Sequence, residues 1–212
     1  MIKVFDDWCN PSVQEIIYNT FTSSELNWNL PTNQYSTVSP DVAKLRMEKD
    51  SRVIDHPQMV HPVVLEGQLS KNTPLAPLVL YLVGEFFNSI APSLIGEEVR
   101  VMRVKANLLH KHEVRKKVWY NPPHVDPRYD PDKSRHHVVC LYYITDSDGD
   151  TFFFDNAENH GIIKRVSPKP GRMVLFDGHH LHASSGPEIA DSRIVINTNV
   201  SLPFDVKELL GL

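Results

Sequence analysis

After Gly96 the hydrophobic period of the chain changes from helical to two, and this change limits the possible folds more than any other feature. Along residues 99–108 the even positions are apolar, while Arg103, Lys105 and Asn107 share the other face, as in a strand. β-Branched and aromatic segments follow, bounded by turn residues, at 137–145, 151–154, 161–166, 172–176 and 193–200. Several short strands at such spacing predict a β-barrel or a β-sandwich.

Turn residues separate these segments. Asp146–Asp150, which contains an Asp-Gly pair, follows residues 137–145 and precedes residues 151–154. This order predicts a hairpin with Asp-Gly at its turn. The same run resembles part of a calcium-binding loop, but it lacks the later glutamate that a twelve-residue loop requires. Pro170-Gly171 predicts a second turn.

The first half of the chain predicts helices. Pro11–Phe21 forms a helical pattern behind a capping Asn10, and residues 77–90 place apolar side chains at helical spacing, which indicates a helix packed on a sheet. Residues 27–74 are rich in Asn, Ser, Thr and Pro and predict mostly loop with short elements. We therefore expect one domain, with a helical and loop support region (1–95), a β core (96–203) and a C-terminal tail (204–212).

Composition excludes several classes of protein. The 212 residues carry 22 Lys plus Arg against 26 Asp plus Glu, so no basic field favours nucleic acid. Two cysteines are too few for a disulfide framework, and no apolar leader or membrane-length segment is present. These features predict a soluble, cytoplasmic protein that binds neither membrane nor nucleic acid. Seven of the 11 histidines fall between His124 and His182, which directs the search for a metal site.

The strongest candidate site combines His124 and Asp126 with His182. In an extended segment, residues two apart point to the same side, so His124 and Asp126 can bind one cation together. Two histidines and one carboxylate on one face of a metal are typical of non-haem Fe(II) oxygenases. Such an ion keeps a net positive charge and attracts an anionic chelating co-substrate.

Arg193 is the candidate for the far end of a dicarboxylate co-substrate, because arginine binds carboxylates bidentately and stays charged when buried. A hairpin that turns near Pro187 and Glu188 would bring Arg193 opposite His182. Asn197 falls on the same strand face as Arg193 and is expected to point into the barrel.

With these residues in place, the chain resembles the prolyl 4-hydroxylase-like branch of the Fe(II)- and 2-oxoglutarate-dependent dioxygenases, in particular small members from bacteria and their phages. The likeness is carried by His124-Val125-Asp126, Tyr143–Phe153, Lys169–Asp177, His182 and Arg193. It implies a double-stranded β-helix, or jelly roll, in which the triad binds Fe(II) and Arg193 binds the distal carboxylate of 2-oxoglutarate. It also implies O2 as co-substrate and hydroxylation of a peptide, prolyl or other, or of a small molecule, with release of succinate and CO2.

Some positions depart from that branch. An early strand usually carries a tyrosine that contacts 2-oxoglutarate, and this chain has Asn107 there, which we assign to co-substrate binding. Tyr120 lies four residues before His124. His179 and His180 compete with His182 for the role of distal ligand.

Two other functions fit the same pattern. A non-catalytic jelly roll would keep the fold, with or without a metal. A metal-binding cupin-like enzyme would act without 2-oxoglutarate, and then Arg193 would be a surface ion-pair partner. The basic run Lys111–Lys117 could bind phosphate or nucleic acid, although a solvated loop is the simpler interpretation.

Overall fold

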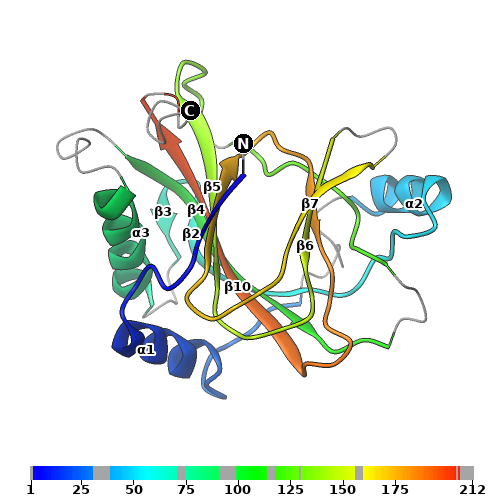
Figure 1. Cartoon of the computed structure of the whole chain (residues 1–212). Helices are drawn as coiled ribbons and strands as arrows, with labels where there is room; N and C mark the ends of the chain where they lie inside the picture. Colours follow the sequence, from blue (N-terminus) through cyan, green and yellow to red (C-terminus); the bar gives the residue numbers. More distant parts are fainter. Residues whose placement is uncertain are drawn as a thin grey trace.

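The computed structural model describes residues 2–30, 39–70, 75–90, 99–113, 118–128, 130–155, 160–203 and 205. Within these ranges the strands form two antiparallel sheets that face each other (Figure 1). The larger sheet has the order β1 (Ile2–Phe5), β8 (Met173–Asp177), β5 (His136–Tyr143), β10 (Ser192–Leu202), β4 (Arg100–His110), β2 (Met59–Leu65), β3 (Gln68–Leu69). The smaller has the order β7 (Ile162–Val166), β6 (Thr151–Phe154), β9 (His182–Ser184). The predicted fold class, mainly β with a jelly-roll core and N-terminal helices, is confirmed.

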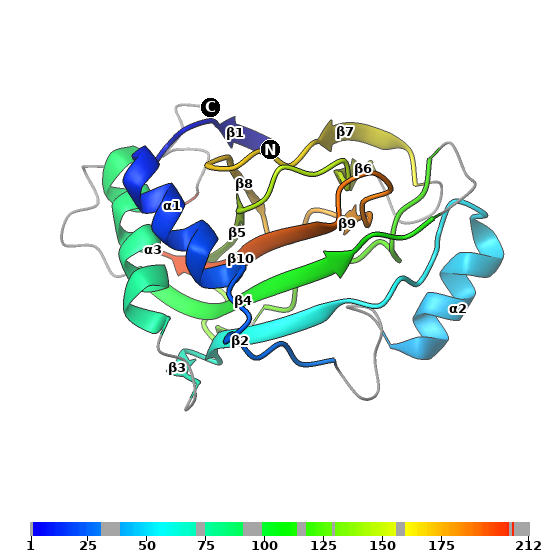
Figure 2. The same ribbon diagram turned by 90° about the horizontal axis from the view of Figure 1, so that it is seen from below.

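Two helices cover the outer face of the larger sheet. These are α1 (Pro11–Phe21) and α3 (Ala76–Ile90), which lie side by side in Figures 1 and 2. Their buried side chains join one apolar cluster with the outward residues of β4, β5, β8 and β10. Both predicted helices are confirmed, and the Asn10 side chain accepts a hydrogen bond from the Val13 N–H at 3.0 Å.

The inner face of the larger sheet carries a second apolar cluster. Along β5 the side chains alternate, so that Val139, Leu141 and Tyr143 point inward while their neighbours point toward the helices. The inward residues pack against Phe153 of β6 and Phe176 of β8. This cluster packs the inner faces of the two sheets against each other.

The predicted hairpin between residues 137–145 and 151–154 is wrong. β5 pairs with β8 and β10, whereas β6 pairs with β7 and β9 in the other sheet. The Asp-Gly segment therefore crosses between sheets. Asp148 stabilises the crossing, because its carboxylate accepts backbone N–H groups of residues 188–190 at 3.0–3.2 Å. An Asp-Gly pair marks a sharp change of direction, but it does not fix which strand comes next.

The predicted hairpin between His182 and Arg193 is also wrong. β9 pairs with β6, and β10 pairs with β4 and β5, so the two residues belong to different sheets. They come together across the interior of the molecule, where both line one cavity. The loop between them thus connects the two sheets.

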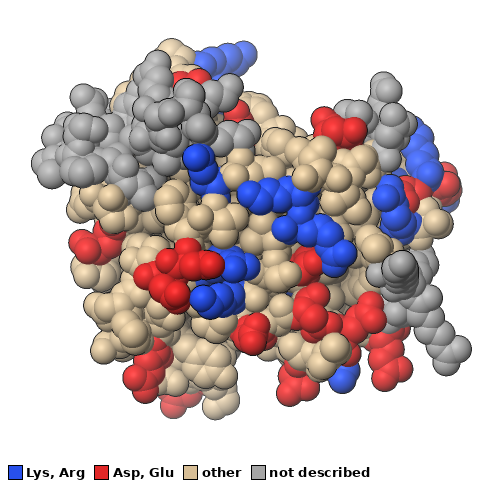
Figure 3. Space-filling model, viewed as in Figure 1, with Lys and Arg blue, Asp and Glu red and all other residues tan. Residues whose placement is uncertain are grey.

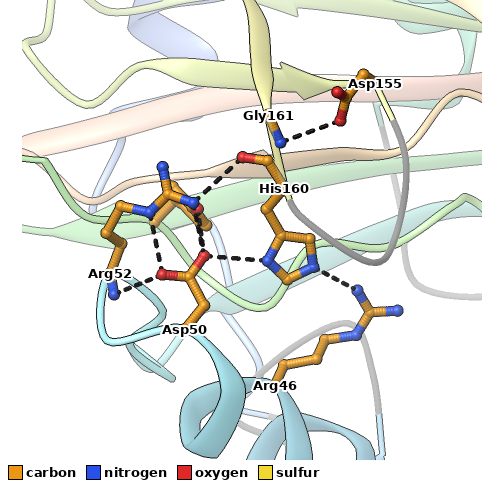
Figure 4. Close-up of polar contacts among 7 residues, drawn as sticks. Arg46, Asp50, Arg52, Asp155, His160 and Gly161 are labelled. Carbon is orange, nitrogen blue, oxygen red and sulfur yellow. Dashed lines mark hydrogen bonds and ion pairs between the residues drawn. The ribbon is translucent and has the colours of Figure 1, made fainter.

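Residues 39–70 contain more regular structure than their composition indicated. α2 (Pro40–Lys49) begins after Ser39, and β2 pairs with β4 despite a proline at position 62. Figure 4 shows how the segment after α2 is fastened to the residues that precede β7. Asp50 accepts hydrogen bonds from Arg52 and pairs with the buried His160 at 3.1 Å.

Charges of both signs are interspersed on the face that Figure 3 shows, with no large area of one sign. Ion pairs such as Arg172–Asp6 tie the β7–β8 connection to the segment after β1. None of the described helices has the length and apolarity needed to cross a bilayer. The predicted boundaries near residues 95 and 204 fall in segments outside the described residues, so the division of the chain stays a prediction. Residues 114–117 of the basic run also lie outside the described residues.

Candidate functional site

Two histidines from distant parts of the chain lie side by side. His124 forms an isolated antiparallel bridge with His182 of β9, in which each backbone N–H donates to the other residue's carbonyl at 2.9 Å. Side chains of directly paired residues share one face of a sheet. The two ring centroids are accordingly 4.5 Å apart.

Asp126 is the third member of the group, and its carboxylate contacts β4 and β10 of the larger sheet. It lies two residues after His124, as the i and i+2 relation requires, and its side chain is buried. Arg103 of β4 donates to Oδ1 at 2.8 Å, and Asn197 and Asn199 of β10 donate to Oδ2 at 3.0 and 3.3 Å. One ligand atom from each of His124, Asp126 and His182 lies within 4.8 Å of the others.

The protonation states suit a divalent metal. His124 Nδ1 lies 3.2 Å from the Pro122 carbonyl and His182 Nδ1 lies 2.9 Å from the His180 carbonyl, so Nδ1 donates and the lone pair falls on Nε2. Burial and the neighbouring His182 lower the pKa of His124 to about 3. Burial likewise lowers the pKa of His182. Both imidazoles are neutral at pH 7, the form that binds a metal.

Asp126 is ionised in the same environment. Burial opposes its ionisation, but the positive charge of Arg103, followed by smaller contributions that include Lys105, holds the pKa of the carboxyl well below its usual range. Two neutral imidazoles and one carboxylate are the donor set of the non-haem iron site. The residues present therefore fit Fe(II).

A cavity opens beside these three residues. It has an empty volume of about 350 Å³, including its open mouth, and its walls come from both sheets. The lining residues are Gln58, Asn107, His124, Leu141, Thr151, His182, Ser184, Arg193, Val195 and Asn197. The sequence-predicted Asn107, Arg193 and Asn197 are thus brought to the same cavity as the two histidines.

Arg193 is almost fully buried at the wall of this cavity, with 2% of its surface exposed. Its Nε donates to the Gly149 carbonyl at 2.7 Å, and Nη2 donates to Thr151 Oγ1 at 2.8 Å. Its guanidinium carbon lies 5.6 Å from the ring centre of Tyr143. A side chain at position 149 would crowd it, because a Cβ there would lie 3.0 Å from Arg193 Cδ.

No carboxylate pairs with Arg193 among the described residues. Burial lowers its pKa, but an arginine starts near 12.5 and stays charged at pH 7. A buried guanidinium without a counter-ion is costly, so this end of the cavity is suited to an anion. Asn107 Oδ1, also at the cavity, is buried without a hydrogen-bond partner in the described part of the chain, and it offers a second polar contact.

The competing candidates lie elsewhere. His179 is exposed and pairs with Asp177 at 3.0 Å, and neither His179 nor His180 joins the group of potential metal ligands. The Tyr120 hydroxyl donates to Asp50 at 2.7 Å, and the ring packs on Phe154, away from the residues that line the cavity.

Sequence reasoning did not assign a role to Arg103, Asn199 or Thr151. Arg103 was placed on the face of β4 that turns out to be the inner face, and a charged residue on a buried strand face is a usable signal. Asn199 lies two residues from Asn197 and so shares its side of β10. Thr151 lines the cavity because the chain crosses to the smaller sheet before β6, where the sequence predicts a hairpin.

Residues 105–201 match the family model described as the 2OG-Fe(II) oxygenase superfamily. The matched segment, a little under half of the chain, is similar to this superfamily. Its members use Fe(II), 2-oxoglutarate and O2, which agrees with the predicted cofactors. No curated protein sequence gives a significant match.

Solved structures share the fold at low sequence identity. An oxidoreductase of the 2OG-Fe(II) oxygenase family from Burkholderia pseudomallei is 15% identical, with a TM-score of 0.59, over 94% of this chain and 85% of that one. A prolyl-4-hydroxylase from Pseudomonas putida is 11% identical, with a TM-score of 0.55, over 94% and 91%. A prolyl hydroxylase from Trichoplax adhaerens, in complex with a hypoxia inducible factor peptide fragment, is 14% identical, with a TM-score of 0.52, over 99% and 86%. The predicted likeness to prolyl 4-hydroxylases is confirmed at the level of the fold.

Proposed function

We propose that this protein is an Fe(II)- and 2-oxoglutarate-dependent hydroxylase. In this proposal His124, Asp126 and His182 bind the iron, and Arg193 binds the distal carboxylate of 2-oxoglutarate, with Asn107 as a further contact. One observation carries the proposal: a single cavity has two neutral imidazoles, with a carboxylate beside them, at one side, and at another a buried guanidinium that no carboxylate of the described residues pairs with.

In this proposal the protein's own side chains hold the metal ligand Asp126 and the co-substrate ligand Arg193 in fixed orientations. Arg103, Asn197 and Asn199 fix the Asp126 carboxylate through both oxygens, so that its orientation is set before a metal arrives. Thr151 and the Gly149 carbonyl hold the Arg193 side chain in one rotamer, which reduces the entropy lost when a carboxylate binds. When bound, the iron and 2-oxoglutarate supply the oxidising chemistry with O2, releasing succinate and CO2.

The substrate proposed is a peptide, prolyl or other, or a small molecule. The Trichoplax enzyme, whose structure holds a peptide fragment, supports the peptide class by its similar fold. Fold alone does not transfer a substrate, so the small-molecule class stands beside it.

The test is 2-oxoglutarate turnover in the absence of a second substrate. Purified protein with Fe(II) is expected to release succinate slowly, and anaerobic addition of 2-oxoglutarate to the Fe(II) protein is expected to produce a charge-transfer band in the visible spectrum. Asp126→Ala should abolish both signals, whereas Arg193→Met should weaken 2-oxoglutarate binding and leave metal binding intact. A wild-type protein that binds metal but gives neither succinate nor the band would favour the non-catalytic or cupin-like alternatives.

A further inference from the structure

Lys105 lies beside the candidate site, on the same face of β4 as the cavity-lining Asn107, and has no assigned role in binding the metal or 2-oxoglutarate. The strand register places it on β4 directly opposite Asn197 of β10 and Pro62 of β2. Residues directly opposite each other on neighbouring strands have Cβ atoms about 5 Å apart on the same face. Figure 2 shows these three strands side by side. Asn197 donates a hydrogen bond to Asp126, so the cross-strand neighbour of Lys105 contacts one of the three proposed metal ligands.

The charge of Lys105 is only partly balanced, because the nearby Asp126 carboxylate, which raises the pKa of Lys105, is already paired with Arg103. Arg103 on the same face forms a 2.8 Å ion pair with Asp126, but Lys105 makes no hydrogen bond or ion pair with any residue that the structure describes. Its side chain is partly buried. Burial, and then the charge of Arg103, lower the pKa of Lys105 to about 8, so most of the lysine is protonated at pH 7. A partly buried ammonium without a partner is unfavourable, which indicates that an anion is missing.

Lys105 is poorly placed for the distal carboxylate of 2-oxoglutarate. Lys105 is opposite Asn197 on β10, and Asn197 is four residues from Arg193 along the same strand. At the rise of a strand, these two positions on β10 are roughly 13 Å apart. Arg193, and not Lys105, is therefore the residue placed for that distal carboxylate. Val60 and Pro62 of β2 share this face beside Lys105, so the ammonium is flanked by partly buried apolar surface.

We propose that Lys105 binds a carboxylate of the oxidised substrate, which would then be a molecule with an anionic group and an apolar body. This inference rests on the proposed function. The anionic group would lie next to Asp126, and the apolar body against Val60 and Pro62. Lys105 would thereby select substrates by charge without contributing to the binding of metal or 2-oxoglutarate.

The experiment uses the full chain loaded with Co(II) and saturating 2-oxoglutarate, and follows the visible cobalt spectrum during titration with acetate. Acetate serves as the carboxylate probe, and acetamide as its neutral counterpart. Acetate is expected to perturb the wild-type spectrum, and acetamide to leave it unchanged. Lys105→Met should weaken acetate binding by roughly tenfold or more, as expected for the loss of a charge-assisted hydrogen bond, whereas Lys105→Arg should retain it.

Lys111→Met, at an exposed lysine just beyond the end of β4, is the matched control and should behave like the wild type. Equal acetate affinity in wild type and Lys105→Met would overturn the inference, as would a wild type that binds cobalt and 2-oxoglutarate but does not respond to acetate. A higher Kd for 2-oxoglutarate in Lys105→Met would also overturn it, because Lys105 would then bind the co-substrate. A wild type that gives no cobalt spectrum would refute the proposed function itself, and this inference with it.

Discussion

Replacing Arg103 with methionine tests the electrostatic balance of the three-residue site. The Arg103–Asp126 pair is 2.8 Å long, and its side chains are only 8% and 1% exposed. Removing one partner of a buried ion pair costs about 3–5 kcal/mol, because the other charge stays buried. Asn197 and Asn199 still donate to Asp126, so we expect about 3 kcal/mol. For a chain of this length that corresponds to a Tm lower by roughly 6–12 °C.

The loss should depend on metal. A divalent cation bound by Asp126 would replace the missing positive charge, so Mn(II) should raise the Tm of Arg103→Met by more than it raises the wild-type Tm. The assay is thermal unfolding of chelator-treated protein by circular dichroism, with and without Mn(II). Removing the positive charge of Arg103 should also tighten metal binding, because it no longer repels the ion.

Arg135→Met is the matched control. Arg135 is a buried arginine that pairs with Asp130 at 3.4 Å and donates to Ser201, outside the candidate site. Its loss should lower the Tm, but Mn(II) should not recover the difference. The reasoning is refuted if Mn(II) shifts the Tm of both variants equally, or if Arg103→Met unfolds at the wild-type temperature.

Two further predictions concern the loops around the site. Asp148→Ala removes the acceptor of three backbone N–H groups and should lower the free energy of unfolding in urea by about 2 kcal/mol, whereas Ala at the exposed Asp146 should change it little. Burial, followed by the charges of two neighbouring histidines, lowers the pKa of His56 to about 4 from an ordinary 6.5. The unfolded chain therefore binds a proton at His56 between these values and the folded chain does not, so stability falls as the pH drops from 6.5 to 4. His56→Gln should make that pH profile shallower, and a profile as steep as the wild type's would show that His56 does not contribute.

Much of the fold could be predicted from the hydrophobic periodicity of the sequence and from its capping and turn residues. The alternation on β4 and the capped helix at Asn10 depend on neighbours in sequence, and both appear as predicted. The two hairpin predictions were wrong because strand pairing depends on contacts between residues distant in sequence. Whether a strand after a tight turn pairs with the previous strand or crosses to a second sheet depends on contacts such as Asp148 with residues 188–190, which are distant in sequence.

The candidate site was predictable where residue chemistry is specific and obscure where it is not. His124 and Asp126 stand two apart in an extended segment, which links them by local geometry. The preference for His182 over His179 depends on the family pattern, and in the structure it is His182 that forms the bridge to His124. The polar residues behind Asp126 could not be assigned in advance. Arg103 and Asn199 meet the carboxylate because β4 and β10 are neighbours in the sheet, and sequence alone does not show which strands are neighbours.

The most direct test of the account is metal binding by variants of the three proposed ligands. Equilibrium dialysis with Mn(II) should give one ion for each wild-type chain, and Ala at His124, Asp126 or His182 should abolish stoichiometric binding. His179→Ala should bind as the wild type does, because that side chain is exposed and pairs with Asp177. Full binding by the three Ala variants, or its loss in His179→Ala alone, would contradict the account.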